Sequence, residues 1–243
     1  MKLSFIIISF KSDHLLKNLL NKIPRKHEII IVENSRQIRT KQTLEKKFQN
    51  LKVIIPEKNL GYAAAFNKAL KLSKNKFLIT ISPDIRIDKN LITKIETLLN
   101  NFKNFSLMAP EYRNNKIYQN FTRLNSSKDY FKIKNYQMLK VKNIDWCFCI
   151  LNKSKFKSNK ILDENFFLYF ETHDLCKKLH LMKKKMLIVK NLKFDHLGTS
   201  SSNKKYRLKI AMNRNWHFSW SKFYFYKKNY NYLFALKKIL PNL

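Results

Sequence analysis

The chain has 243 residues, of which 44% are hydrophobic and 14% aromatic, so it can bury a sizeable core and is not a disordered chain. Only 2 residues are glycine and 5 are proline, which excludes collagen-like and low-complexity proteins. The formal net charge is +34, but 42 of the 50 cationic residues are lysines spread along the whole chain. Nucleic-acid readers rely on arginine for bidentate contacts, so we attribute the charge to compositional bias and solubility rather than to a polyanion surface.

The sequence shows no sign of membrane insertion or secretion. No apolar run approaches the roughly 18 residues that a membrane-spanning helix needs, and the apolar run at residues 5–9 is too short for the core of a signal peptide. The cysteines Cys147, Cys149 and Cys176 form no CxxC pair, which favours a reducing compartment. We therefore expect a cytoplasmic protein.

In the first half of the chain, short apolar runs alternate with amphipathic stretches. The runs predict buried strands, and the stretches between them predict helices. In chain order we expect strand 3–9, helix 13–20, strand 28–32, helix 40–48, strand 51–55, helix 62–72, strand 77–81 and helix 88–102. This alternation is typical of a doubly wound parallel α/β sheet, whose ligands bind at the carboxyl ends of the strands.

The second half of the chain is less regular. Residues 111–142 are rich in Asn, Lys, Tyr and Ser and predict a loop or an irregular insertion. Beyond them we expect strand 144–151, an apolar aromatic run at 166–170, helix 173–182, strand 185–194, a polar loop at 195–203 and a helical tail from 206 to 240. The tail is dense in aromatic residues and lysine. It can form helices that pack across the domain, or a surface that contacts an anionic membrane.

Both glycines are informative because this composition replaces glycine almost everywhere else. Gly61 ends a strand and opens a helix, where backbone N–H groups and the helix dipole favour an anion. Gly198 lies in a polar loop. Both can also be ordinary turn glycines, but each adjoins a polar cluster, which favours a functional role.

A candidate metal site follows the strand at 77–81. Ser82, Pro83 and Asp84 form a turn there, and a carboxylate at a strand's carboxyl end can hold Mg²⁺ or Mn²⁺ against a diphosphate. His196 can add a nitrogen ligand, which would favour Mn²⁺. The plainer interpretation is a simple turn and an ordinary loop histidine.

Two acidic residues directly follow the aromatic run at 166–170. Glu171 and Asp174 lie at the start of a predicted helix, where Thr172 can cap the helix and its dipole favours acidic residues. The functional alternative is a general base on the floor of a cleft, from which the flanking aromatic rings exclude water.

Taken in order, these segments resemble the family 2 glycosyltransferases of GT-A fold, and within them the rhamnosyltransferase-like branch. The resemblance spans residues 3–200. It is carried by residues 4–9, 28–35, 59–67, 82–84, 162–171, 174–176 and 196–200. Each segment alone is a weak indication of the family, but the whole set in this order is specific for it.

The resemblance implies a doubly wound, mostly parallel sheet that continues into a mixed half. The domain would cover residues 1–205, with a nucleotide-sugar-binding half at 1–110, an acceptor half at 111–205, and C-terminal helices at 206–243 packed on the domain. The implied reaction is the inverting transfer of a sugar from a nucleotide diphosphate donor to a hydroxyl of a glycan or lipid-linked acceptor, in cell-surface polysaccharide synthesis.

The resemblance also implies roles for individual residues. A divalent cation, Mn²⁺ or Mg²⁺, would be held by Asp84 and His196, and the catalytic base would be Asp174 or Glu171. The implied donor-binding residues are Ser9, Lys11, Glu33, Asn34, Gly61, Asn67, Ser82 and Asp84.

Three residues depart from the family pattern. Ser82 leaves a single carboxylate in the metal motif, Thr172 stands where the family has its base, and Glu33 replaces an aspartate. These departures leave open a degenerate transferase that binds donor without efficient turnover. A basic nucleic-acid-binding protein is the alternative from another class, although we expect no specific nucleic acid. We also expect peripheral contact with the inner face of an anionic cell membrane.

Overall fold

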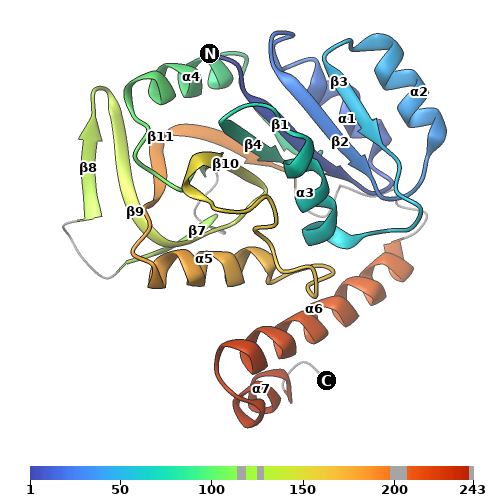
Figure 1. Cartoon of the computed structure of the whole chain (residues 1–243), viewed down its shortest axis with the longest axis vertical. Helices are drawn as coiled ribbons and strands as arrows, with labels where there is room; N and C mark the ends of the chain where they lie inside the picture. The colour runs from blue at the N-terminus through green and yellow to red at the C-terminus, as the bar shows by residue number, and fades with distance from the viewer. Residues whose placement is uncertain (114–118, 125–128, 198–206, 241–243) are drawn as a thin grey trace.

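The computed structural model describes residues 1–113, 119–124, 129–197 and 207–240. In these ranges the chain forms a large mixed sheet with helices on both faces, and two C-terminal helices lie beneath it (Figure 1). None of the helices in these ranges is long and apolar enough to cross a lipid bilayer.

The N-terminal strands form a parallel half-sheet in the order β3–β2–β1–β4. These strands are β1 (Ser4–Ser9), β2 (Glu28–Glu33), β3 (Leu51–Ile54) and β4 (Phe77–Ile81). The helices that alternate with them are α1 (Asp13–Leu20), α2 (Ile38–Lys47), α3 (Gly61–Leu72) and α4 (Leu91–Asn101). The alternation predicted from the sequence is confirmed, with ends that differ by a few residues.

Hydrophobic clusters on the two faces of the sheet form the core. Because side chains alternate along a strand, Phe5 and Ile7 of β1 join the cluster that contains Leu98 of α4, whereas Ile6 joins the cluster that contains Ala65 of α3. Helices α1, α2 and α4 therefore cover one face of the sheet, and α3 covers the other.

The second half of the sheet is mixed. β10 (Phe148–Asn152) runs antiparallel between β4 and β6 (Leu107–Tyr112), and β11 (Met186–His196) lies parallel to β6. The two-residue strand β5 (Ile85–Arg86) pairs with the end of β11. The division expected after residue 110 falls inside β6, so the sheet runs without a break between the two halves.

The segment expected to be irregular, residues 111–142, contains strands. β7 (Phe121–Arg123) and β8 (Tyr130–Ile133) both pair with β9 (Tyr136–Ile144), and β9 pairs with β11. The expectation was wrong because the hairpin between β8 and β9 turns at Lys134, whose φ is 51°, where glycine or asparagine usually gives the signal. Only part of β9 is buried, so its polar residues hide the strand pattern.

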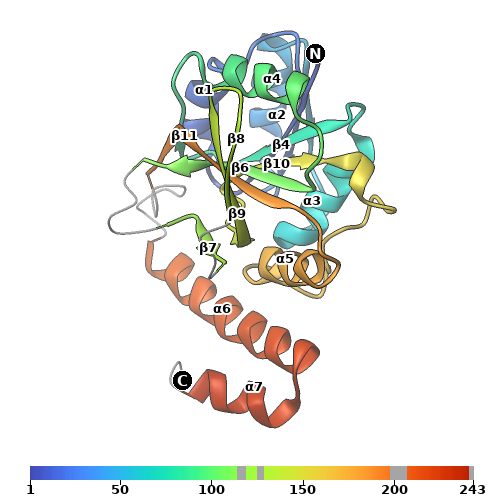
Figure 2. The same cartoon turned by 90° about the vertical axis from the view of Figure 1, so that its left-hand side faces the viewer.

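The remaining elements lie toward the C-terminus. A short 3-10 turn, η2 (Lys153–Lys155), follows β10, and α5 (Glu171–Leu181) packs against the sheet on the same face as α3. The tail forms two helices, α6 (Arg207–Asn229) and α7 (Tyr232–Ile239). The break occurs where Asn231 caps α7 by accepting a hydrogen bond from Phe234 N at 2.8 Å. Figure 2 shows α6 running beneath the domain and α7 folding back along it.

Candidate active site

A cavity of about 570 Å³ opens at the carboxyl ends of the parallel strands. This is the edge at which α/β sheets bind ligands, and the volume is in the range of small-molecule sites. The sequence-predicted residues that line the cavity are Asn34, Gly61, Ser82, Asp84 and His196. The other walls come from the loop at 167–169 and from α6.

The structure brings Asp84 and His196 together across more than a hundred residues of sequence. The turn after β4 is fixed because Ser82 N donates to Cys147 O at 2.8 Å, and the pairing of β5 with β11 then places His196 opposite Ile85. Asp84 Oδ2 lies 3.3 Å from His196 Nε2, and Asp84 is only 4% exposed. A carboxylate and an imidazole therefore face each other at the cavity wall.

This pair fits a divalent cation whose remaining coordination positions are filled by a substrate. Among the described residues no group of three or more His, Cys, Asp or Glu side chains gathers to hold a metal. One carboxylate oxygen and one imidazole nitrogen leave most coordination positions open, as expected where substrate phosphates and water supply the other ligands.

Asp145, which the sequence analysis missed, lies near this pair. Burial raises the pKa of its carboxyl to about 6, and the charge of His196 partly offsets that rise. Its only sequence signal is that a lone acidic residue stands between β9 and β10. That signal is too weak to separate it from an ordinary loop aspartate.

Gly61 is required by a close backbone approach. Its φ is +71°, and a Cβ at this position would lie 2.2 Å from Phe167 O. Gly61 N donates to Asn59 Oδ1 at 3.0 Å and Tyr62 N donates to Phe167 O at 2.7 Å. The first two amides of α3 therefore already have acceptors within the protein, and they do not supply the anion site expected at this helix end.

We expect Gly61→Ala to lower the free energy of unfolding by about 3 kcal/mol or more, because the added methyl group meets a backbone carbonyl and the backbone is left-handed there. Urea unfolding followed by circular dichroism measures the change. Lys68→Ala, an exposed substitution in the same helix, is the control and should change stability by less than about 0.5 kcal/mol. A Gly61→Ala protein as stable as the control would contradict the contact with Phe167.

Asn34 and Glu33 hold the loops around the cavity. Asn34 Nδ2 donates to Gly61 O at 2.9 Å, and Leu60 N donates to Asn34 Oδ1 at 3.3 Å. Glu33 is 1% exposed, and its carboxylate accepts hydrogen bonds from the Ser35 hydroxyl and from Gln37 N. Asn34 reaches the cavity wall, whereas Glu33 fixes the turn that leads into α2 and is not among the lining residues.

Ser9, Lys11 and Asn67 also lie outside the cavity lining. Lys11 N donates to Ser35 Oγ at 3.1 Å, and Ser9 Oγ is buried without a hydrogen-bond partner. Asn67 is buried and joins α3 to residues 161–164 through hydrogen bonds on both sides of its amide. Asn67 thus positions the segment that leads to the aromatic loop.

Glu171, the first residue of α5, is a buried carboxyl group beside the cavity. It is 6% exposed, and its Oε2 has no hydrogen-bond partner. Burial raises the pKa of Glu171 from 4.5 to about 7. Its charge acts on the phenols of Tyr62 and Tyr169, which both line the cavity. A carboxyl group with such a pKa is suited to accept a proton near neutral pH.

Asp174 faces the C-terminal helix instead. Its carboxylate lies 2.8 Å from Lys228 Nζ and 3.0 Å from Lys178 Nζ, and it accepts a hydrogen bond from Asn229 Nδ2 at 3.0 Å. It is 1% exposed, and neither Asp174 nor Glu171 is among the residues that line the cavity. The two acidic candidates differ in their neighbours, because Asp174 docks α6 whereas Glu171 acts on Tyr62 and Tyr169 of the cavity wall.

Helix α6 contributes to the cavity, which the sequence analysis did not foresee. Its inner face supplies Asn213, Arg214 and His217, and His217 stacks on Phe167 with ring centroids 4.3 Å apart. The available signal was the rarity of arginine in this lysine-rich chain, since Arg214 is one of only eight. Gly198 lies outside the described residues.

The fold is similar to that of solved glycosyltransferases. A structure of TarS 1–349 from S. aureus matches with a TM-score of 0.61 and 18% identity, covering 89% of this chain and 65% of that one. TarS has also been solved with UDP and with UDP-GlcNAc. The mannosyltransferase PcManGT from Pyrobaculum calidifontis, in complex with GDP-Man and Mn²⁺, matches with a TM-score of 0.65 and 11% identity, covering 99% of this chain and 68% of that one. At these identities the likeness establishes the GT-A fold.

Sequence comparison adds the family. The low-salt glycan biosynthesis hexosyltransferase Agl10 of Haloferax volcanii is 24% identical over 187 residues, which cover 72% of this chain and 60% of that protein. The chain thus matches less than two thirds of the length of this relative. The profile of Glycosyl transferase family 2 matches residues 4–159, which include the parallel half-sheet and Asp84. Because this match covers more than half of the chain, the protein belongs to glycosyltransferase family 2.

Proposed function

We propose that the protein is an inverting glycosyltransferase that moves a sugar from a nucleotide diphosphate donor to a hydroxyl of a glycan or lipid-linked acceptor, in cell-surface polysaccharide assembly. The observation that carries the proposal is the pair Asp84 and His196, 3.3 Å apart at the carboxyl end of a parallel sheet. A buried carboxyl group, Glu171, lies beside the same cavity.

The donor's diphosphate would bind at the end of the cavity formed by Asp84 and His196. These two side chains would hold Mn²⁺ or Mg²⁺, and such a cation stabilises the negative charge that develops on a leaving diphosphate. Arg214 lies on the same cavity and can neutralise a phosphate oxygen. The neighbours solved with UDP, UDP-GlcNAc, or GDP-Man and Mn²⁺ support a donor of this class.

Glu171 would act as the general base. In the transfer, the acceptor oxygen forms a bond to the anomeric carbon while the bond from that carbon to the diphosphate oxygen breaks on the opposite face. The acceptor's proton passes to the carboxylate, and the electron pair of the broken bond leaves with the nucleoside diphosphate. With Thr172 unable to serve as a base near neutral pH, we assign this role to Glu171, whose pKa is raised to about 7 by burial.

A donor screen tests the proposal. In the presence of Mn²⁺, one nucleotide sugar among UDP-GlcNAc, GDP-mannose and a nucleotide-linked rhamnose should raise the melting temperature, because a ligand at 100 times its dissociation constant adds about 2.7 kcal/mol of stability. The rhamnose donor is included because the sequence resembles the rhamnosyltransferase-like branch. If no nucleotide sugar or free nucleotide diphosphate shifts the transition, the proposal fails. A donor that binds without hydrolysis or transfer would identify the degenerate transferase.

A further inference from the structure

The outer side of the C-terminal helices exposes large apolar side chains in a regular pattern. Met212, Trp216 and Trp220 recur every fourth residue along α6 and are 71%, 70% and 52% exposed. Residues with this spacing lie along one side of a helix. Leu233 of α7 is 78% exposed, and Leu240, which directly follows α7, is 66% exposed. We call these five residues the outer apolar face.

The outer apolar face is not the surface of a loosely attached helix. The opposite side of α6 is docked on the domain, because Ser221 Oγ donates to Leu168 O at 2.8 Å and Lys228 binds Asp174. Helix α7 is fixed to α6 by aromatic contacts, in which the rings of Tyr226 and Phe234 meet edge to face with centroids 5.5 Å apart. The exposed rings therefore lie on a helical pair whose inner contacts are already made.

The charge of the two helices is of one sign. Between residues 207 and 240 the sequence contains no Asp or Glu, and it carries the basic residues Arg207, Lys209, Arg214, Lys222, Lys227, Lys228, Lys237 and Lys238. Lys227 and Lys237 are exposed, and Lys227 lies over the Tyr232 ring at 6.0 Å. Exposed tryptophans and leucines flanked by lysines match the chemistry of an anionic lipid surface, where rings lie at headgroup depth and cations meet lipid phosphates.

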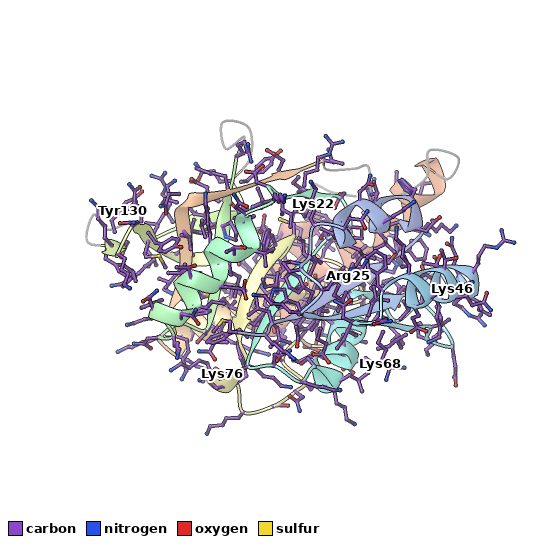
Figure 3. The ribbon with its side chains drawn as sticks, turned by 90° about the horizontal axis from the view of Figure 1, so that it is seen from above. Lys22, Arg25, Lys46, Lys68, Lys76 and Tyr130 are labelled. Carbon is purple, nitrogen blue, oxygen red and sulfur yellow. The ribbon has the colours of Figure 1, made fainter. Side chains whose placement is uncertain are left out.

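Elsewhere the basic side chains are dispersed. In Figure 3 the labelled Lys22 and Arg25 of the loop between α1 and β2, Lys46 of α2 and Lys68 of α3 are spread over the domain. Acidic partners such as Glu96 and Glu111 lie within the domain and pair with some of its lysines. What distinguishes α6 and α7 is therefore the combination of an outer apolar face with basic residues and no acidic residue.

We propose that the outer apolar face of α6 and α7 binds an anionic lipid bilayer. A second copy of this chain on the same face would bring two sets of basic residues together without an acidic partner, which opposes self-association there. The inner side of α6 lines the cavity with Arg214 and His217, so lipid binding would bring the cavity close to the membrane surface. A lipid-linked acceptor, as proposed above, would then lie in the membrane next to the cavity. Lipid binding itself does not depend on the proposed transferase activity.

Co-sedimentation of the whole chain with vesicles tests the inference. We expect binding to vesicles of phosphatidylcholine with about one third phosphatidylglycerol, much weaker binding to pure phosphatidylcholine, and weaker binding at high salt. The double variant Trp216→Ser/Trp220→Ser should bind at least about tenfold more weakly, because it removes the two largest exposed rings. The vesicle affinity of Lys227→Gln/Lys237→Gln should fall by about thirtyfold, since each of the two cations near the surface contributes about 1 kcal/mol.

Matched controls change the same kinds of residue elsewhere. Ile38→Ser/Tyr130→Ser removes two exposed apolar side chains from α2 and β8, and Lys46→Gln/Lys68→Gln removes two exposed charges from α2 and α3. Both controls should bind vesicles like the unmodified protein. Equal binding to neutral and anionic vesicles, or equal losses in the controls, would overturn the inference. Concentration-dependent dimers that only the tryptophan variant abolishes would overturn it in favour of a second copy. The donor screen reports on the proposed function separately.

Discussion

Replacing Asp84 by Asn is expected to abolish the dependence of donor binding on Mn²⁺. The amide keeps the shape of the side chain but loses the negative charge that would hold the cation, and His196 alone is a poor site for a hard divalent ion. Titration calorimetry with the donor found in the screen, with and without Mn²⁺, should show the affinity in Mn²⁺ falling by about 100-fold or more. Binding without the metal should change little.

Asp88→Asn is the matched control for this measurement. Asp88 lies four residues further along the chain and pairs with Arg113 at 2.8 Å, outside the cavity that Asp84 lines. Its substitution should leave the Mn²⁺-dependent heat unchanged. If Asp84→Asn behaved like this control, the carboxylate would have no place in a metal site, although the fold assignment would stand.

The parts of the site that sequence could predict are those fixed by local pattern. Alternating strands and helices place the ends of β1, β2 and β4 on one edge, so the sequence alone predicts that Asn34 and Asp84 lie near each other, and both line the cavity. His196 could be added only as a residue of the polar loop predicted after strand 185–194, and the structure extends β11 to include it. These predictions depend on the period of the hydrophobic pattern, which is the strongest signal a single sequence carries.

The parts that sequence could not predict depend on contacts between distant segments. Gly61 is required because the carbonyl oxygen of Phe167, more than a hundred residues away in sequence, approaches it closely. The sequence analysis expected this glycine to allow the binding of an anion instead. Asp174 pairs with Lys228 and accepts a hydrogen bond from Asn229, both of α6, and its position at a helix start does not reveal these contacts. Arg214 reaches the cavity only because α6 docks beneath the domain (Figure 2).

Glu171→Gln is expected to lower the rate of sugar transfer by at least 100-fold, in line with typical contributions of a general base. The same change should stabilise the protein at alkaline pH. The pKa of Glu171 is raised by burial from 4.5 to about 7, so the stability that the neutral carboxyl provides is fully present below about pH 4.5 and is lost as the pH rises through 7. Glutamine stays neutral, so the variant should exceed the unmodified protein by about 2 kcal/mol at pH 8.

The variant Asp174→Asn distinguishes the role of Asp174 from that of Glu171. Asp174 neutralises Lys228 and Lys178, so its loss should weaken the docking of α6 and lower the free energy of unfolding by about 1–2 kcal/mol. Transfer by this variant should fall much less than in Glu171→Gln. Urea unfolding between pH 5 and pH 8 and a transfer assay over the same range measure both properties, and the rate of the unmodified enzyme should rise with pH through about 7. A large loss of transfer in Asp174→Asn with Glu171→Gln still active would reverse the roles, since a carboxylate that only docks a helix cannot set the rate of proton removal.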